Sequence, residues 1–195
     1  MILLVNNSNE PNDELSYIRA IRHTLRKCKI KFIETNRNSK TSLPKKGIKG
    51  IILSGSSLTI SQKTVFEDYA NDIQVLLQYQ VPVLGICFGC QMIHVIFGGT
   101  LQHGKRYICD ELPVILDSRS KLFNGLSPEQ VVKFCFSDLP IHSTMKPIAT
   151  LFHPIKKQMV PCAYEKGHFY ALLFHPEAIQ ETWIIFQNFY SICCL

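Results

Sequence analysis

Residues 81–91 read V-P-V-L-G-I-C-F-G-C-Q, and the fold expected for the rest of the chain follows from this stretch. The apolar run from Val81 to Ile86, flanked by proline and glycine, is typical of a buried strand in a parallel sheet, and residues 90–96 can continue as a helix. The G-x-C-x-G spacing puts Cys87 on a tight turn between them, where only small flanking residues fit. The unpaired N–H groups and the dipole at a helix N-terminus favour a thiolate there. These features favour a nucleophilic Cys87, and the alternative is a buried core cysteine, which is commoner among free cysteines.

Strand and helix patterns alternate through the residues before this turn. Apolar runs predict strands at residues 1–5, 30–33 and 50–53, and apolar residues at helical spacing predict helices over residues 13–25 and 64–79, with a polar loop at 35–47. Such alternation favours an α/β fold with a doubly wound, mostly parallel sheet, whose ligands bind beyond the carboxyl ends of the strands. Ser54-Gly55-Ser56 and Cys87 both follow such strand ends.

After Gly98-Gly99 the pattern changes to five shorter strands, separated by turns rich in proline, glycine and serine. We expect them at residues 112–116, 131–136, 148–152, 159–164 and 169–174, paired antiparallel at the side of the sheet. Residues 182–193 predict a closing helix packed on the core. No repeat or linker interrupts the pattern, so we expect one domain over residues 1–195.

Composition narrows the class of protein. With 46% hydrophobic and 18% charged residues among 195, the chain has the composition of a globular protein. Its apolar runs are far too short to span a bilayer, and the N-terminal M-I-L-L-V-N-N lacks the features of a signal peptide, so we expect a cytoplasmic protein. The net charge of +6 comes from scattered residues such as Lys27 and Lys31. We therefore expect a solvated basic face, with no nucleic-acid groove and no membrane contact.

The cysteines have no regular framework. Eight of them occur at irregular spacing in a long chain, which favours reduced thiols. Cys87 and Cys90 form one C-x-x-C, which leaves a redox pair or half of a metal site as alternatives. No second C-x-x-C is present, and the adjacent Cys193 and Cys194 have poor spacing for metal ligands, so we expect no metal.

A second motif, A-L-L-F-H-P-E at residues 171–177, supplies groups that a nucleophilic cysteine needs. Such a cysteine requires a base that takes its proton and returns it to the leaving group, and the base requires a third group that fixes its tautomer. His175 and Glu177 are two residues apart, so in an extended backbone their side chains lie on the same side, and Pro176 restricts the backbone between them. The alternative is a surface histidine at a strand end.

Four motifs occur in order along the chain: L-S-G-S-S after a strand, G-I-C-F-G-C-Q at the turn, F-G-G-T beyond it, and F-H-P-E before the last helix. In this order they resemble the class I (triad) glutamine amidotransferases, a family with a flavodoxin-like core and a Cys-His-Glu triad. The resemblance covers nearly the whole chain, roughly from Met1 to Phe189. Residues 110–126, D-E-L-P-V-I-L-D-S-R-S-K-L-F-N-G-L, are similar to the amidotransferase part of GMP synthetase.

The resemblance implies a catalytic role for each residue that matches the family's motifs. Cys87 would be the nucleophile, His175 the acid/base, and Glu177 the residue that orients the histidine. The oxyanion hole would use the backbone N–H groups of Phe88 and Ser56.

The resemblance also implies positions that hold the substrate, and some of these depart from the family's pattern. Gly55, Gln91 and Ser137 with Asp138 match positions that contact the substrate glutamine. The family's G-G-P reads Gly55-Ser56-Ser57 here. If the oxyanion peptide needs a positive φ, Ser56 costs about 1–2 kcal/mol relative to glycine. The family's S-H-G-D is shortened to F-S-D at residues 136–138.

The activity implied is hydrolysis of L-glutamine that yields ammonia for transfer, with no metal or organic cofactor. The alternatives are a γ-glutamyl hydrolase or peptidase with the same triad, and a non-catalytic module that regulates a synthetase. Only two glycine-rich stretches could form a phosphate cradle: Gly55-Ser56-Ser57 is assigned to the oxyanion loop, and Gly98-Gly99-Thr100 lies beyond the helix after Cys87 and does not open one. Few residues follow Glu177. We therefore expect the ammonia to pass to a separate ATP-dependent synthetase, such as one that makes GMP.

Overall fold

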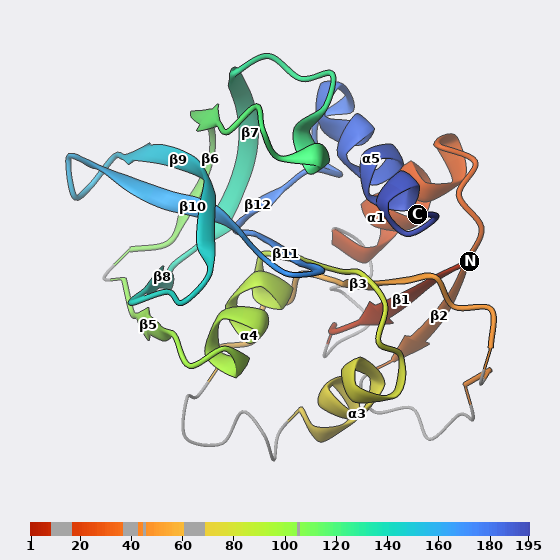
Figure 1. Cartoon of the computed structure of the whole chain (residues 1–195). Coiled ribbons are helices and arrows are strands. Elements are labelled where there is room, and N and C mark those ends of the chain that lie inside the picture. The colour runs from red at the N-terminus through yellow and green to blue at the C-terminus, as the bar shows by residue number, and fades with distance from the viewer. Residues whose placement is uncertain (9–16, 37–42, 45, 61–68, 105) are drawn as a thin grey trace.

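The structure is a computed structural model that describes residues 1–8, 17–36, 43–44, 46–60, 69–104 and 106–195. Its centre is a ten-stranded sheet in the order β12-β7-β6-β9-β10-β11-β4-β3-β1-β2. Helices lie on both sides of one half of this sheet, and a second group of strands extends from the other half (Figure 1).

Five neighbouring strands of the sheet run parallel, in the order β2-β1-β3-β4-β11. They are β2 (Phe32–Asn36), β1 (Ile2–Asn6), β3 (Gly50–Leu53), β4 (Val83–Ile86) and β11 (Phe169–Leu172). All residues of β1, β3 and β4 are buried, which explains why these strands are almost continuously apolar. This is the strand order of a flavodoxin-like doubly wound sheet, so the predicted fold class is confirmed.

The helices cover both faces of this parallel half. The helices α1 (Tyr17–Lys27) and α5 (Ile184–Ile192) lie on one face, and α3 (Ala70–Gln78) and α4 (Phe88–Ile96) lie on the other (Figure 1). Helix α1 buries Ile18, Ile21 and Leu25, which share one stripe at helical spacing. The predicted starts of the first two helices, at residues 13 and 64, lie outside the described residues. The closing helix is confirmed, and a 3-10 turn, η3 (Gln180–Trp183), precedes it.

The other half of the sheet is antiparallel, as predicted. Its strands are β6 (Ile108–Leu116), β7 (Glu129–Phe136), β9 (Lys146–His153) and β10 (Gln158–Lys166). The expectation that they are shorter than the first strands is wrong, because each has eight or nine residues. Their polar and exposed ends extend beyond the apolar runs from which the prediction was made.

The segment 169–174 differs most from its prediction as one antiparallel strand. Its first part, β11, is the fifth parallel strand, parallel to β4 and antiparallel to β10. The chain then leaves the ladder at Leu173, and β12 (Phe174–His175) pairs with β7 at the far end of the sheet. An apolar run indicates burial but carries no information about the direction of its partner, which explains the error.

A small separate sheet joins β5 (Thr100–Gln102) and β8 (Leu139–Ile141), and a 3-10 turn, η2 (Lys121–Phe123), follows β6. Neither strand of this sheet was predicted, because three residues carry too little pattern.

One pair of cysteines is joined, which contradicts the expectation of reduced thiols throughout. Cys109 of β6 and Cys135 of β7 form a disulfide and stand directly opposite each other in the antiparallel register. They are 26 residues apart in the sequence, so their spacing alone did not predict the pairing. The other six cysteines, Cys87 and Cys90 among them, are free.

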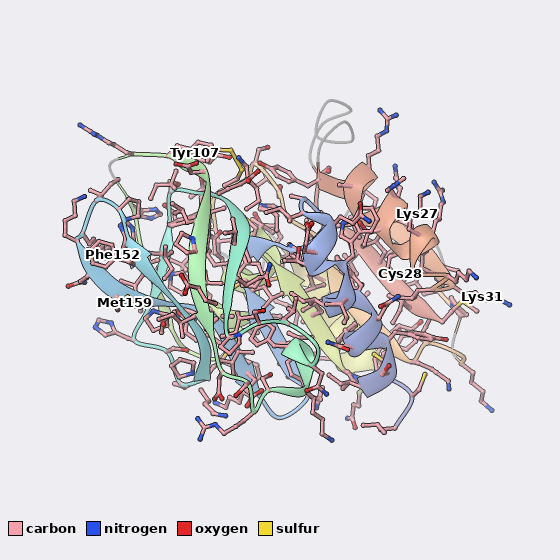
Figure 2. The ribbon with its side chains drawn as sticks, turned by 90° about the horizontal axis from the view of Figure 1, so that it is seen from above. Lys27, Cys28, Lys31, Tyr107, Phe152 and Met159 are labelled. Atoms are coloured by element: carbon pink, nitrogen blue, oxygen red, sulfur yellow. A yellow bond between two sulfur atoms is a disulfide. The ribbon has the colours of Figure 1, made fainter. Side chains whose placement is uncertain are left out.

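The surface differs between the two ends of the molecule (Figure 2). Phe152 and Met159 pair across β9 and β10, are about half exposed, and lie at the same end as Tyr107. The exposed Lys27 and Lys31 lie at the opposite end, where α1 leads into β2. None of the helices in the described ranges is long and apolar enough to cross a membrane.

Candidate active site

Cys87 lies at the turn between β4 and α4, as its motif predicts. Its backbone has φ 51° and ψ −101°, and it is the N-cap of α4. The flanking glycines lie in very close contact with backbone. A Cβ atom at Gly85 would lie 2.5 Å from the carbonyl oxygen of Gly89, and one at Gly89 would lie 2.5 Å from the carbonyl oxygen of Leu53. The requirement for small residues at this turn is therefore confirmed, and the positive φ at Cys87 is strain of the kind that functional sites hold, about 1–3 kcal/mol.

Cys87 is hydrogen-bonded to backbone carbonyl oxygens of two strands. Its Sγ donates to the carbonyl oxygen of Cys135 at 3.3 Å, and its backbone N–H donates to that of Leu172 at 2.7 Å. The N–H groups in the first turn of α4, including that of Phe88, have no intrahelical acceptor. A negatively charged oxygen formed beside Cys87 would therefore find a donor and the positive end of a helix dipole.

Cys90, the second cysteine of the C-x-x-C, is completely buried within α4. Burial raises the pKa of its thiol well above the usual value, and the charges of Cys87 and Cys162 add to this effect. A thiol with a raised pKa forms little thiolate and is a poor nucleophile. The burial of Cys90 therefore disfavours it as the reactive thiol and disfavours a redox pair. Within the described ranges, no three histidine, cysteine, aspartate or glutamate side chains are grouped as metal ligands.

His175 and Glu177 form the buried pair that their spacing predicts. The Nδ1–H of His175 donates to Oε1 of Glu177 at 2.8 Å, and the two residues are 1% and 4% exposed. Burial by itself lowers the pKa of His175, but the negative charges of Glu177 and Cys87 outweigh it and raise that pKa well above its usual value. The Nε2 atom is buried and has no hydrogen-bond partner among the described residues. The bond to Glu177 therefore fixes the orientation of the ring and leaves Nε2 as the nitrogen available for proton transfer.

The backbone after His175 is held by the residues that follow it. The hydroxyl of Thr182 donates to the carbonyl oxygen of Pro176 at 2.7 Å, and the indole N–H of Trp183 donates to that of Glu177 at 3.0 Å. The turn η3 thus fixes the H-P-E segment. A surface histidine, the alternative from sequence, is excluded by the burial of His175.

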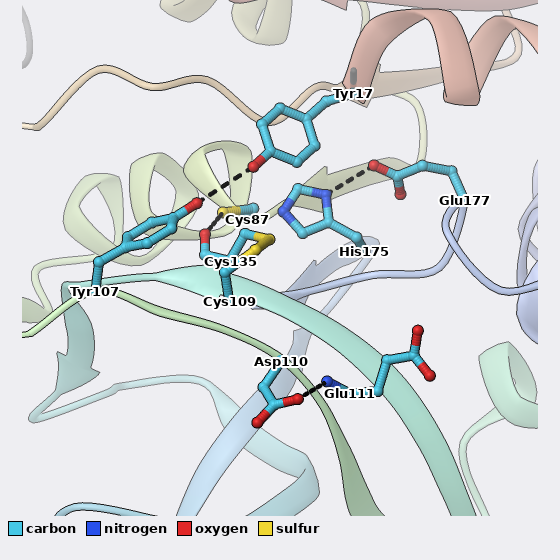
Figure 3. The surroundings of a disulfide bond; sticks show 9 residues. All are labelled: Tyr17, Cys87, Tyr107, Cys109, Asp110, Glu111, Cys135, His175 and Glu177. Atoms are coloured by element: carbon cyan, nitrogen blue, oxygen red, sulfur yellow. Dashed lines mark hydrogen bonds and ion pairs between the residues drawn. A yellow bond between two sulfur atoms is a disulfide. The ribbon is translucent and has the colours of Figure 1, made fainter.

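Gly55 is the point at which these groups meet. A Cβ atom at this position would lie 3.0 Å from Cε1 of His175 and 3.6 Å from Cβ of Cys87. The histidine ring and the cysteine therefore both pack against the α-carbon of Gly55, and Figure 3 shows the imidazole between Cys87 and Glu177. A larger residue at position 55 would displace them.

The loop of Ser56 is fixed by hydrogen bonds that the sequence analysis missed. The backbone N–H of Asn7, just after β1, donates to Oγ of Ser54 at 2.9 Å, and this hydroxyl donates to the carbonyl oxygen of Gly55 at 2.9 Å. Among the described non-glycine residues, positive φ occurs at Lys29, Cys87, His142 and Lys157, and so not at Ser56. The strain expected for a serine in place of glycine is therefore not present in this conformation.

Part of the predicted site lines one cavity of about 220 Å³, whereas Gly55, Phe88, His175 and Glu177 are not among its lining residues. Cys87 and Ser56 line it together with Gln91, Ser137 and Asp138. The amide Nε2 of Gln91 donates to the backbone carbonyl of Asp138 at 3.0 Å, which ties the segment 137–138 to α4. The shortened segment is thus held against the cavity.

Five further residues that line the cavity lie outside the motifs, namely Tyr17, Leu58, Thr59, Tyr107 and Cys135. Tyr107 is exposed and lies just before β6, and Cys135 lies near the end of β7. Their proximity to Cys87 depends on the pairing of distant segments.

Asn7 and Ser54 could have been identified from the sequence, because each is a polar residue that directly follows a buried strand.

Comparison with known proteins shows the family of the chain. The family model of the class-I glutamine amidotransferases matches residues 12–192. The chain therefore belongs to the class-I glutamine amidotransferase family.

Its relatives within the family include GMP synthases. The chain is 30% identical over 147 residues to the glutamine-hydrolyzing GMP synthase of Wolinella succinogenes, covering 72% of this chain and 27% of that protein. It is 29% identical over 168 residues to the enzyme of the same name from Helicobacter pylori, covering 85% of this chain and 31% of that protein. The chain thus spans less than a third of the length of these relatives.

A protein from Thermoplasma acidophilum, described as a putative GMP synthase subunit, has a solved structure of similar fold. It has a TM-score of 0.78 at 21% identity, with 99% of this chain and 93% of that chain covered. At this identity the likeness concerns the fold alone.

Proposed function

We propose that this chain hydrolyses the side-chain amide of L-glutamine, with Cys87, His175 and Glu177 as its catalytic residues. The observation that carries the proposal is their convergence at Gly55. His175 and Cys87 both pack against this glycine, and Glu177 is bonded to the far side of the imidazole. A nucleophile, a base and an orienting carboxylate in this arrangement define an acyl-transfer site.

In the first half of the reaction, Nε2 of His175 accepts the proton of the Cys87 thiol, and Sγ attacks the side-chain carbonyl carbon of glutamine to form a C–S bond. The carbonyl electron pair moves to oxygen, where the N–H groups of Phe88 and Ser56 stabilise the charge. The C–N bond then breaks, and Nε2–H of His175 donates its proton to the departing nitrogen, so that ammonia leaves. The raised pKa of His175 keeps the imidazolium available for this step.

In the second half, a water molecule attacks the γ-glutamyl thioester. His175 accepts a proton from the water, the C–S bond breaks to release glutamate, and His175 then returns the proton to the Cys87 thiolate, which restores the thiol. Glu177 holds Nδ1 throughout, so Nε2 is the atom that accepts and donates the proton.

We assign the substrate's α-carboxylate and α-amino group to the end of the cavity formed by Gln91, Ser137 and Asp138. The support is that these residues share the cavity with Cys87. The carboxylate of Asp138 has two partners within the protein. It accepts a hydrogen bond from the Ser137 hydroxyl at 3.1 Å and pairs with Nδ1 of His103 at 3.0 Å. The backbone of this segment is thereby held in place.

The ammonia, in this proposal, passes to an ATP-dependent synthetase. The support is the likeness to glutamine-hydrolyzing GMP synthases, of whose length this chain spans less than a third. Formation of GMP is the reaction that these likenesses favour.

A glutaminase assay on the purified chain tests the proposal. Glutamate release from glutamine and from a γ-glutamyl peptide is measured with and without the synthetase recovered from the native source. We expect weak hydrolysis of glutamine alone and stimulation by the synthetase. Preference for the peptide would identify a γ-glutamyl hydrolase instead. No turnover in the complex would favour the non-catalytic module and overturn the proposal.

A further inference from the structure

The imidazole of His175 is restrained on two sides. Its edge is bonded to Glu177, and one face is stacked on the ring of Tyr17, with the ring centroids 4.3 Å apart and an interplanar angle of 22°. One hydrogen bond alone would leave the imidazole free to turn about the line from Nδ1 to the carboxylate. A parallel ring in contact with its face removes this freedom.

Tyr17 is itself held in place by a residue from the opposite side of the cavity. Its hydroxyl lies 3.3 Å from that of Tyr107, and Figure 3 shows the two side chains meeting end to end above Cys87. Tyr17 begins α1 and Tyr107 precedes β6, so the contact joins two elements far apart in the sequence. Burial, followed by the contact with Tyr107, raises the pKa of Tyr17, and its hydroxyl therefore stays neutral at physiological pH.

We propose that Tyr17 is a positioning residue for His175, and that Tyr107 holds Tyr17 against the imidazole. The inference rests on the proposed function, because it concerns the assigned acid/base.

The proposed effect of Tyr17 has two parts. The stack keeps the imidazole in the plane in which Nε2 can exchange a proton beside Cys87. The face of an aromatic ring also carries partial negative charge and attracts a cation, so the stack favours the imidazolium over the neutral imidazole. The charged groups that act on His175 are Glu177 from its own segment and Cys87 from the turn before α4, and Tyr17 adds a neutral ring from α1.

Three substitutions distinguish the contribution of the Tyr17 ring from that of the hydroxyl contact. Tyr17→Leu removes the ring, Tyr17→Phe keeps the ring but removes its hydroxyl, and Tyr107→Phe removes the partner hydroxyl. Tyr190→Leu is the matched control, because Tyr190 is a half-buried tyrosine of α5 that does not line the cavity.

Two readouts are measured for each variant. The first is kcat and KM for glutamine. The second is the titration midpoint of His175, followed by NMR of histidine-labelled protein, which needs no turnover. The free energy of an aromatic contact of this kind is equivalent to about a threefold to tenfold change in rate. We expect Tyr17→Leu to lower kcat by about this factor, to change KM little, and to move the His175 midpoint to lower pH.

Tyr17→Phe should keep most of kcat and should leave the His175 midpoint close to that of the unsubstituted chain. Tyr107→Phe should lower kcat by less than Tyr17→Leu does. The proposal is overturned if Tyr17→Leu has the midpoint and kcat of the unsubstituted chain, or if Tyr17→Phe loses as much as Tyr17→Leu. If the unsubstituted chain does not hydrolyse glutamine but Tyr17→Leu still moves the midpoint, the proposed function fails and the positioning role stands.

Discussion

Replacing Gly55 with alanine should slow the chemistry without unfolding the chain. The new Cβ atom would lie 3.0 Å from Cε1 of His175, whereas carbon atoms in contact prefer about 3.5–4.0 Å. The imidazole must therefore move by roughly half an ångström. Its bond to Glu177 and its stack on Tyr17 restrain that movement. Because a misplacement of about 1 Å at a reacting group costs about 10²-fold, we expect kcat to fall about tenfold.

The folded state should tolerate this substitution, which makes the test specific. The φ angle of Gly55 is not positive, so alanine needs no strained backbone. Alanine also lowers the conformational entropy of the unfolded chain, which stabilises the folded state by about 0.4–1 kcal/mol. This gain offsets part of the destabilisation that the new contact causes.

The control for Gly55→Ala is Gly167→Ala in the turn between β10 and β11. Gly167 has φ 60° and no atom within 4 Å of an added Cβ. Alanine there should lower the free energy of unfolding by about 1–2 kcal/mol and leave kcat unchanged. Glutaminase kinetics and thermal unfolding of both variants check the two predictions. The reasoning is refuted if Gly55→Ala keeps full kcat, or if it loses activity only in proportion to lost stability.

Four further predictions concern the proposed catalytic and binding groups. Cys87→Ser should abolish glutamine turnover, and a glutamine-analogue electrophile should label Cys87 first; labelling of Cys90, detected by mass spectrometry, would show that the nucleophile is wrongly assigned. His175→Ala should lower kcat by about 10²–10⁴-fold. Glu177→Gln should cost less and should move the alkaline limb of kcat/KM to lower pH, because the charge that raises the pKa of His175 is removed; an unchanged pH profile with full activity would exclude the orienting role. Gln91→Ala should raise KM for glutamine by about tenfold, since one hydrogen bond to the substrate-side segment is lost, and an unchanged KM would argue against that role.

Local patterns were sufficient for the parts of the site that are close in sequence. The strand, the cysteine and the helix after it lie within a few residues, so the G-x-C-x-G spacing could predict the turn and the need for Gly85 and Gly89. The pairing of His175 with Glu177 is also local, because a separation of two residues places both side chains on one side of an extended backbone. Neither prediction required knowledge of the sheet order.

Features that depend on distant pairings could not be predicted in this way. The parallel alignment of β11 with β4 and the disulfide between Cys109 and Cys135 arise from the register of the sheet. The hydroxyl of Ser54, two residues before Ser56, accepts from the backbone N–H of Asn7, which lies 47 residues earlier in the sequence than Ser54. Sequence patterns show that such residues are polar or apolar, but not which of them come into contact.

The sequence by itself therefore determined the α/β alternation, the cysteine turn and the histidine–glutamate pair, because each follows from spacing within one short segment. The tertiary structure alone decided that these segments meet at Gly55, that His175 is buried, and that Tyr17 covers its ring. The physical reason is that β3, β4 and β11 are parallel neighbours in the sheet, so Gly55, Cys87 and His175, which follow the carboxyl ends of these strands, come together. Contacts across those ends join residues far apart in the chain, and no local preference encodes them.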